Sequence, residues 1–185
     1  MARILLISGS TRSASTNTAL LRTAAAAAPV GLEAVLYAGM TSLPHFNPDD
    51  DRDPLPPCVA DLRARIAAAD AVLLCTPEYA GAMPGSFKNL LDWTVGGIEM
   101  YRKPVAWVHA AASPERGRHA QESLATVLGY LHADVVTDAC VHIGVARELV
   151  GADGMIDDAA VRHRTASVLE TLAQHAATRP ASAGR

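Results

Sequence analysis

The stretch "ARILLISGSTRSASTNTALLRTAAAAA", Ala2 to Ala28, joins an apolar run to a helix-like segment through a polar loop, Ser8 to Thr18. A short apolar run followed by a longer segment of helix formers predicts a unit of β-strand, loop and α-helix. The loop is unusually rich in hydrogen-bond donors, which are the hydroxyls of Ser10, Thr11, Ser13, Ser15 and Thr16, the guanidinium of Arg12 and the amide of Asn17. This abundance of donors points to a ligand at the loop.

Outward from this unit, short apolar runs alternate with helix-like segments along the whole chain. Strands are expected at Arg3–Ser8, Leu32–Ala38, Ala71–Thr76, Pro104–Ala110 and Ala133–Ile143. Helices are expected at Asn17–Ala28, Pro57–Ala69, Pro84–Val95, Glu115–Leu131 and Asp157–Ala176. This alternation predicts an α/β fold, in which a parallel sheet is covered by helices on both faces.

Composition limits the kinds of partner. Half of the 185 residues are hydrophobic and 19% are charged, as in a soluble globular domain. The net charge of -3 gives no broad basic surface, so neither nucleic acid nor an anionic membrane is an expected partner. No run is long enough for a membrane span, and no signal peptide is recognised, so we expect a cytoplasmic protein.

Metal and thiol chemistry are not expected either. Cys58, Cys75 and Cys140 are widely spaced and are interpreted as small apolar fillers. The seven histidines show no metal-binding spacing. The loop Leu43–Pro57 holds four aspartates, which are interpreted as a solvated face rather than a metal site.

The first loop is predicted to bind phosphate. In an open α/β sheet, ligands sit at the carboxyl ends of the strands, where a helix amino end offers unpaired N–H groups. The loop has neither the G-x-x-x-x-G-K-[ST] pattern of nucleoside triphosphate sites nor the G-x-G-x-x-G pattern of dinucleotide sites. A phosphate monoester is therefore the expected ligand, and the alternative is a Ser/Thr-rich turn that only caps the helix.

A second loop follows the third predicted strand, in "TPEYAGAMPGSFKNLLDW", Thr76 to Trp93. It should lie beside the first loop, because the carboxyl ends of parallel strands share one edge of the sheet. Tyr79 is suited to cover an aromatic ligand, with backbone groups of Glu78 to Gly81 near the polar edge of that ligand. The alternative is that Tyr79 packs on a neighbouring helix.

Together, "GSTRSASTN" (Gly9–Asn17) and "PEYAGAMPGSFKNLLDW" (Pro77–Trp93) resemble the NAD(P)H-dependent FMN reductases, which include chromate, quinone and azo-dye reductases. The resemblance implies a flavodoxin-like three-layer sandwich with a five-stranded parallel sheet of order 2-1-3-4-5. Residues 1–176 would form one FMN-binding domain, and residues 177–185 a mobile tail.

The resemblance also implies site residues. The FMN phosphate would be bound by Ser10, Arg12, Ser15, Thr16 and Asn17, and the flavin ring would be lined by Pro77, Glu78, Tyr79, Ala80 and Gly81. Ala80 departs from the family, which often has asparagine there. The loop after the fourth strand, "AAASPERGRHA" (Ala110–Ala120), has Ser113, Arg116 and Arg118 where the family has glycines. Ser113 is expected to bind the cofactor, and either arginine is a candidate for NADPH or flavin unless it is only a surface residue.

The implied reaction passes hydride from NADPH or NADH to FMN, and then electrons to a quinone, azo or metal-oxyanion acceptor. No side chain needs to act as acid, base or nucleophile. A homodimer or homotetramer is implied as well. Two alternatives stay open at this point, which are a flavodoxin-like electron carrier without NAD(P)H turnover and a phosphatase-like or nucleotide-binding domain.

Overall fold

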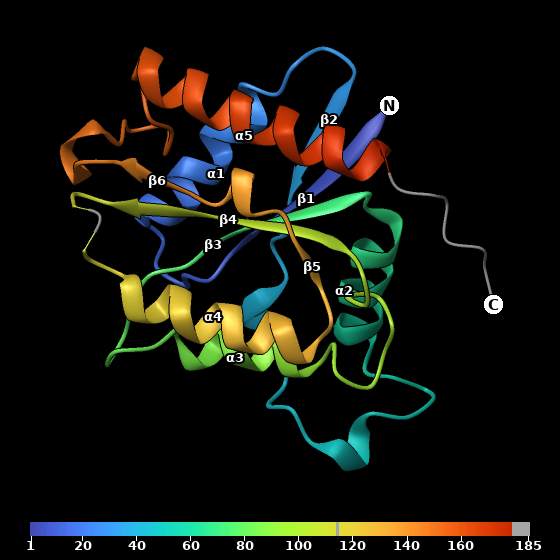
Figure 1. Cartoon of the computed structure of the whole chain (residues 1–185). Coiled ribbons are helices and arrows are strands. Elements are labelled where there is room, and N and C mark those ends of the chain that lie inside the picture. Colours follow the sequence, from blue (N-terminus) through green and yellow to red (C-terminus); the bar gives the residue numbers. More distant parts are fainter. Residues whose placement is uncertain (114, 179–185) are drawn as a thin grey trace.

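The computed structural model describes residues 1–113 and 115–178 and contains one parallel β-sheet. The strands are β1 (Ala2–Ser8), β2 (Leu32–Leu36), β3 (Ala71–Cys75), β4 (Pro104–Ala111), β5 (Asp134–Val135) and β6 (Val141–Gly144). Their order is β2-β1-β3-β4-β5, with β6 also paired to β4 (Figure 1). The predicted order and the flavodoxin-like fold are therefore confirmed.

The single strand expected at Ala133–Ile143 is wrong in one respect, because the structure divides it into two. β5 pairs with the start of β4 and β6 pairs with its end. Between them the chain forms a 3-10 turn, η3 (Thr137–Ala139), which packs against the last helix and buries Ala139 completely. Thr137 and Asp138 favour such a turn, because their side chains compete with strand hydrogen bonds.

Five α-helices cover the sheet. α1 (Thr16–Ala26) and α5 (Ala159–Ala177) lie on one face, and α2 (Pro57–Ala68), α3 (Gly85–Asp92) and α4 (Arg118–Tyr130) lie on the other (Figure 1). α4 begins three residues later than predicted, because Gly117 before it has φ +92 and cannot continue a right-handed helix. Residues 179–185, most of the predicted tail, lie outside the described residues.

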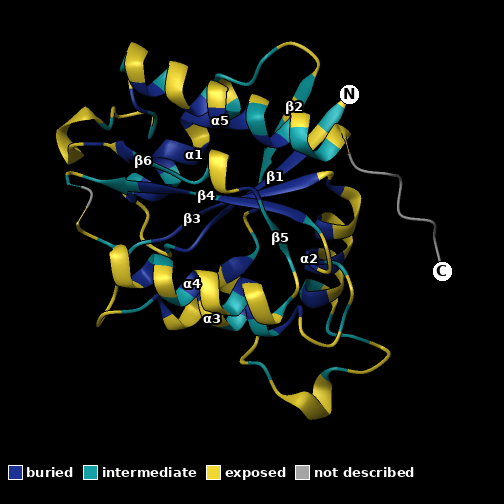
Figure 2. Cartoon of the chain, in the orientation of Figure 1, coloured by how far each residue is buried: buried dark blue, intermediate teal, exposed yellow. Residues whose placement is uncertain are grey.

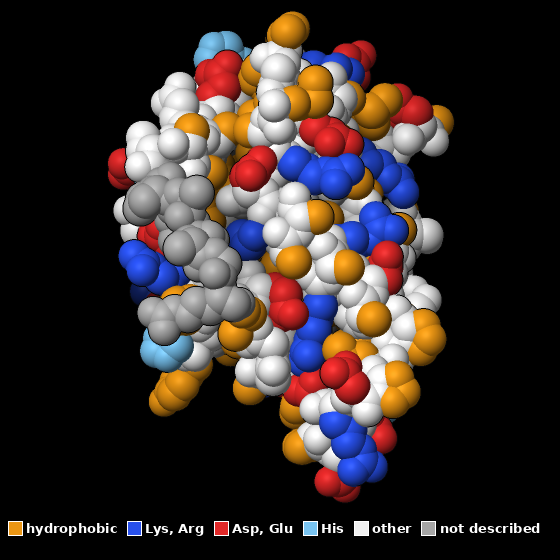
Figure 3. All heavy atoms as spheres, turned by 90° about the vertical axis from the view of Figure 1, so that its right-hand side faces the viewer, with side chains coloured by type: hydrophobic (Ala, Val, Ile, Leu, Met, Phe, Trp, Pro, Cys, Tyr) orange, Lys and Arg blue, Asp and Glu red, His pale blue; other side chains and the backbone are white. Residues whose placement is uncertain are grey.

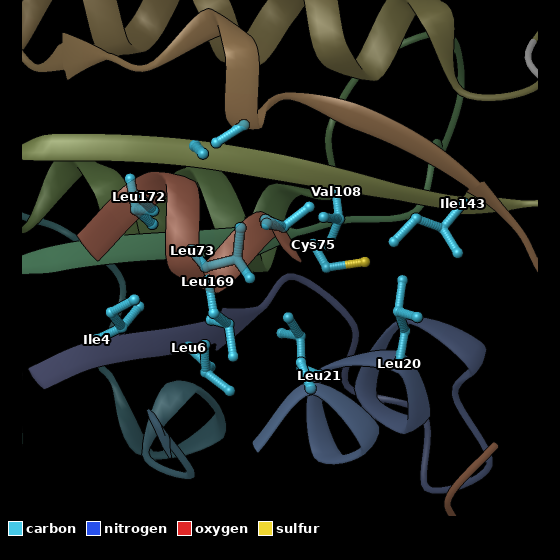
Figure 4. Close-up of a cluster of buried hydrophobic side chains, with 14 of the residues drawn as sticks. Ile4, Leu6, Leu20, Leu21, Leu73, Cys75, Val108, Ile143, Leu169 and Leu172 are labelled. Atoms are coloured by element: carbon cyan, nitrogen blue, oxygen red, sulfur yellow. The ribbon is translucent and has the colours of Figure 1, made fainter. Parts of the chain in front are cut away.

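Each face of the sheet has its own hydrophobic core (Figure 2). The core under α1 and α5 includes Leu20, Leu73 and Leu169, which come from three different elements (Figure 4). The core under α2, α3 and α4 includes the completely buried Phe87 and Trp93. Burial of one such side chain contributes about 1.5–3 kcal/mol, so the two cores hold the strand ends in fixed positions.

The aspartate-rich loop Leu43–Pro57 projects at the bottom of Figure 1 and is not wholly solvated, contrary to the expectation. Asp51 accepts a hydrogen bond from Arg63 of α2 at 2.6 Å, and the two side chains are only 9% and 10% exposed. Arg63 also donates to the carbonyl oxygen of Trp93 at 2.8 Å. Asp51 therefore anchors the loop, while the neighbouring Asp49 and Asp50 are exposed.

The side where the strands begin has a mixed surface. Acidic and basic side chains lie next to one another there (Figure 3), and near it Arg3 pairs with Glu33 at 3.1 Å. Among the described residues no helix is both long and apolar enough to cross a membrane.

Candidate functional site

A cavity of about 670 Å³ opens where β1, β3, β4 and β6 end. Its lining residues come from four segments that are far apart in the sequence: Thr16 and Asn17; Thr76, Pro77 and Glu78; His109, Ala110, Ala111, Ala112, Arg116 and Gly117; and Val145, Ala146, Arg147 and Glu148. The first and second predicted loops thus meet at one edge of the sheet. Four predicted site residues line this cavity, namely Thr16, Asn17, Pro77 and Glu78.

The amino end of α1 forms one wall of the cavity. Ser15 caps the helix, with its hydroxyl accepting from the N–H of Thr18 at 3.3 Å. The N–H groups of Thr16 and Asn17 have no partner among the described residues, and the first turn contains no acidic side chain. A helix end in this condition carries a partial positive charge and unpaired donors, which together suit a phosphate.

Three other predicted phosphate ligands, Ser10, Arg12 and Ser15, lie in the same loop but do not line the cavity. The Ser10 hydroxyl accepts from the N–H of Arg12 at 3.4 Å, which shapes the loop. The Arg12 side chain is exposed and has no ion-pair partner among the residues that the structure describes. It is therefore available to an anion at the loop.

Asn17 is held by the core. The thiol of Cys75 donates to Asn17 Oδ1 at 3.2 Å, and both residues are buried. Because the amide oxygen is used, the Nδ2 group is left to donate toward the cavity. Burial raises the pKa of Cys75 to about 12, so this thiol is a packing group and a hydrogen-bond donor rather than a nucleophile.

The second loop makes a tight turn. Tyr79 and Ala82 exchange two backbone hydrogen bonds, of 2.9 and 3.1 Å, around Ala80 and Gly81. Both central residues have positive φ, +50 and +74, as in the two-residue turns of β-hairpins. Tyr79 is 50% exposed, so it is not packed into a helix interface, and Tyr79, Ala80 and Gly81 stand outside the cavity lining.

Glu78 connects the second loop to the third loop, which is the segment Ala110–Ala120 after β4. Its Oε2 accepts from the N–H groups of His119 and Ala120, at 3.0 and 3.2 Å, in the first turn of α4. A carboxylate at a helix amino end is stabilised by the helix dipole. The amino end of α4 is thus occupied by a side chain of the protein, whereas that of α1 is open.

The loop after β4, Ala110–Ala120, contributes other residues to the cavity than those predicted. Ser113 does not line the cavity, and its hydroxyl bonds to Glu115. The pKa of the Glu115 carboxyl is lowered mainly by a hydrogen bond from its own backbone N–H, and further by the bond from Ser113. Arg116 lines the cavity and Arg118 does not.

His109 and the segment Val145–Glu148 also line the cavity, and neither was predicted from the sequence. His109 lies within a predicted strand, where a lone histidine gives no signal of a site. Val145–Glu148 follows β6. The strand predicted to end at Ile143 was the only indication that a loop would lie here, at the carboxyl edge of the sheet.

Comparison with known proteins identifies the family of this chain. The family model described as NADPH-dependent FMN reductase matches residues 2–148. The chain belongs to this family. The predicted resemblance is confirmed, and so is the predicted class of enzyme, an oxidoreductase that uses FMN with NAD(P)H.

Individual FMN reductase relatives agree with this assignment. The chain is 34% identical to an NAD(P)H-dependent FMN reductase of Pseudomonas aeruginosa over 172 residues, which cover 92% of each protein. It is 27% identical to a quinone reductase of Escherichia coli, with 88% of this chain and 89% of that protein covered. The structure of FerB, a flavoenzyme NAD(P)H:(acceptor) oxidoreductase from Paracoccus denitrificans, matches with a TM-score of 0.80 at 27% identity, covering 95% of this chain and 99% of that one.

The cavity of this FMN reductase fits the cofactor of its family. The open amino end of α1 offers backbone donors for a phosphate, and Arg12 beside it has no competing carboxylate among the described residues. Another wall, Ala110 to Ala112, supplies backbone and small side chains that leave room for a planar ring.

Proposed function

We propose that this chain binds FMN in the cavity, takes hydride from NADPH or NADH, and reduces a quinone, azo compound or metal oxyanion. The observation that carries the proposal is the open amino end of α1 in the wall of a cavity of about 670 Å³. Bound FMN supplies the electron chemistry, since it accepts hydride and returns electrons to an acceptor. The protein's part is to hold the cofactor and exclude competing reactions.

The phosphate end of the proposed site lies at the first loop. The N–H groups of Thr16 and Asn17 would donate to phosphate oxygens, Asn17 Nδ2 would add a side-chain donor, and Arg12 would supply a full positive charge. Ser10 and Ser15 shape the loop and cap the helix, and their backbone groups are proposed as further contacts. The loop has no glycine pattern for a pyrophosphate, which favours FMN over FAD.

The ring end lies between the second and third loops. Pro77 and Glu78 line the cavity on one side, and the turn of Tyr79, Ala80 and Gly81 stands at its edge. The half-exposed Tyr79 is proposed to cover the nicotinamide and the acceptor in turn, at one open face of the ring. Ser113 is proposed to act through the shape of the third loop.

The direct test is a visible spectrum of the purified protein with added FMN, followed by anaerobic mixing with NADPH or NADH. Flavin absorbance should bleach, and it should return when a quinone or azo acceptor is added. Steady-state rate plots should give parallel lines if both substrates use one face. If FMN binds and neither nicotinamide bleaches it, the chain is an electron carrier instead.

Arg12→Ala tests the phosphate contact separately. Loss of a charged hydrogen bond should weaken FMN binding by about 1.5–3 kcal/mol, and riboflavin binding should not change. Arg52→Ala, in the aspartate-rich loop away from the cavity lining, is the matched control. Equal FMN dissociation constants for Arg12→Ala and the unmodified protein would contradict the phosphate contact and favour the alternative that the first loop only caps the helix.

We also propose that two or more copies of this chain associate. Val95, Ile98, Tyr101 and Tyr130 are more than half exposed and surround a second cavity of about 440 Å³ near α3 and α4. A second copy is the proposed cover for this apolar surface. Light scattering of the protein as it elutes from a sizing column measures the mass of the assembly directly.

The single domain over residues 1–176 and the cytoplasmic location stay predictions.

A further inference from the structure

His109, near the end of β4, is a buried histidine in the cavity wall. It is 5% exposed, and its Nδ1 has no hydrogen-bond partner among the described residues. Only two other buried side-chain atoms of the described residues share this condition, Tyr37 Oη and Glu99 Oε2, and neither residue lines the cavity. No hydrogen bond joins either ring nitrogen of His109 to another described residue, although buried polar groups are nearly always hydrogen-bonded. Because the residue lines the cavity, a ligand bound there can supply the missing partner.

The imidazole of His109 is held from two sides. His142 is its register partner on β6, with ring centroids 5.2 Å apart. His142 Nε2 lies 2.8 Å from the carbonyl oxygen of Ala111, and since a carbonyl only accepts, this nitrogen is the donor. On the other side Gly117 approaches so closely that a Cβ there would overlap His109 Nε2. The ring is therefore fixed at the place where β4, β6 and the start of α4 meet.

We propose that His109 donates a hydrogen bond from its imidazole N–H to an acceptor atom of the flavin ring bound in this cavity, with His142 as its positioning residue. This inference rests on the proposed function. A flavin ring carries carbonyl oxygens and ring nitrogens that accept hydrogen bonds, whereas the neighbouring wall, Ala110 to Ala112, has no polar side chain.

The charges around His109 favour a neutral donor. The charges that act on it are those of His142 on β6 and Glu78 after β3. The other charged groups in the same cavity wall are Arg116 before α4, and Arg147 and Glu148 after β6. Burial is the main cause that lowers the pKa of His109, and His142 lowers it further, while Glu78 opposes them. At neutral pH the ring thus keeps one N–H to donate and one bare nitrogen.

The first experiment measures FMN dissociation constants at pH 8 by flavin fluorescence, for the unmodified protein and two variants. His109→Leu removes the donor and should weaken binding on the order of tenfold. His109→Gln keeps an N–H at similar reach and should stay within about threefold of the unmodified protein. His163→Leu, at an exposed position on α5, is the matched control and should change nothing.

The second experiment follows FMN binding to the unmodified protein, and a variant is used only to assign the signals. Side-chain nitrogen resonances of the histidines are recorded with and without FMN, assigned by the loss of one signal in His109→Gln. The donating nitrogen of His109 should shift on FMN binding, and those of His163 should not. This readout decides the question if His109→Leu fails to fold.

The outcomes separate this inference from the proposed function. If the unmodified protein binds no FMN, the proposed function fails together with the inference. If FMN binds equally to all folded variants and the His109 resonances stay in place, His109 is only a core residue. The inference is then overturned while the proposed function stands.

Discussion

The backbone of Ala80 adopts a left-handed conformation, with φ +50, in the turn beside the cavity. For a residue with a Cβ this conformation costs about 1–2 kcal/mol, and glycine and asparagine tolerate it better. Ala80→Gly should therefore raise the free energy of unfolding by about 0.5–1 kcal/mol, and Ala80→Asn should stabilise in the same direction. Urea unfolding of the FMN-free protein measures both.

Ala82→Gly is the control for this prediction, because Ala82 pairs with Tyr79 and has no positive φ. It should not stabilise. A loss of stability in Ala80→Gly would show that the turn is not strained. At this scale the resemblance to the family marked Ala80 only as a departure from the asparagine that is often found there. Its position before Gly81, where turns of this kind favour Asn-Gly, also indicated the backbone conformation.

At the scale of elements, Glu78 fixes the loop after β3 to the first turn of α4. Glu78→Ala removes a charged cap and should lower the free energy of unfolding by about 0.5–2 kcal/mol. Amide exchange at His119 and Ala120 should become faster, since their acceptor is lost. Glu122→Ala, on the same helix in an exposed pair with Arg118, should cost less than about 0.5 kcal/mol. Equal losses in the two variants would contradict the capping role.

The elements show where sequence patterns suffice and where they do not. β1 and β3, buried along most of their length, were predicted within two residues, because continuous apolar runs mark strands covered on both faces. The division of the fifth strand into β5 and β6 depends on how η3 packs against α5, which no local pattern contains. For the same reason the role of the Glu78 carboxylate was not predicted, since its partners are 41 and 42 residues away.

At the scale of the whole molecule, the buried pair of Asp51 and Arg63 joins the aspartate-rich loop to α2 and to the end of α3. Asp51→Ala leaves a buried guanidinium without its carboxylate and should cost about 3–5 kcal/mol. Asp49→Ala, two residues away and exposed, should stay within about 0.5 kcal/mol. Similar unfolding curves for the two variants would show that Asp51 does not anchor the loop, and that its aspartates form the solvated face that composition alone predicts.

The stability of the whole chain should also depend on His109 through pH. Burial, aided by His142, lowers the pKa of this histidine in the folded state below its usual value near 6.5. As the pH falls below that value, the unfolded chain binds a proton that the folded chain does not, so stability decreases. Above pH 7 His109 is neutral in both states and contributes no pH dependence.

To isolate this effect, the free energy of unfolding is measured between pH 5 and 8 for the unmodified protein and for His109→Gln, both free of FMN. The unmodified protein should lose stability toward pH 5 more steeply, with an added slope of at most about 1.4 kcal/mol per pH unit, the limit for one proton. His163→Gln should run parallel to the unmodified protein, since that side chain is exposed. A cost of His109→Gln that is constant with pH would show that the residue acts through packing alone.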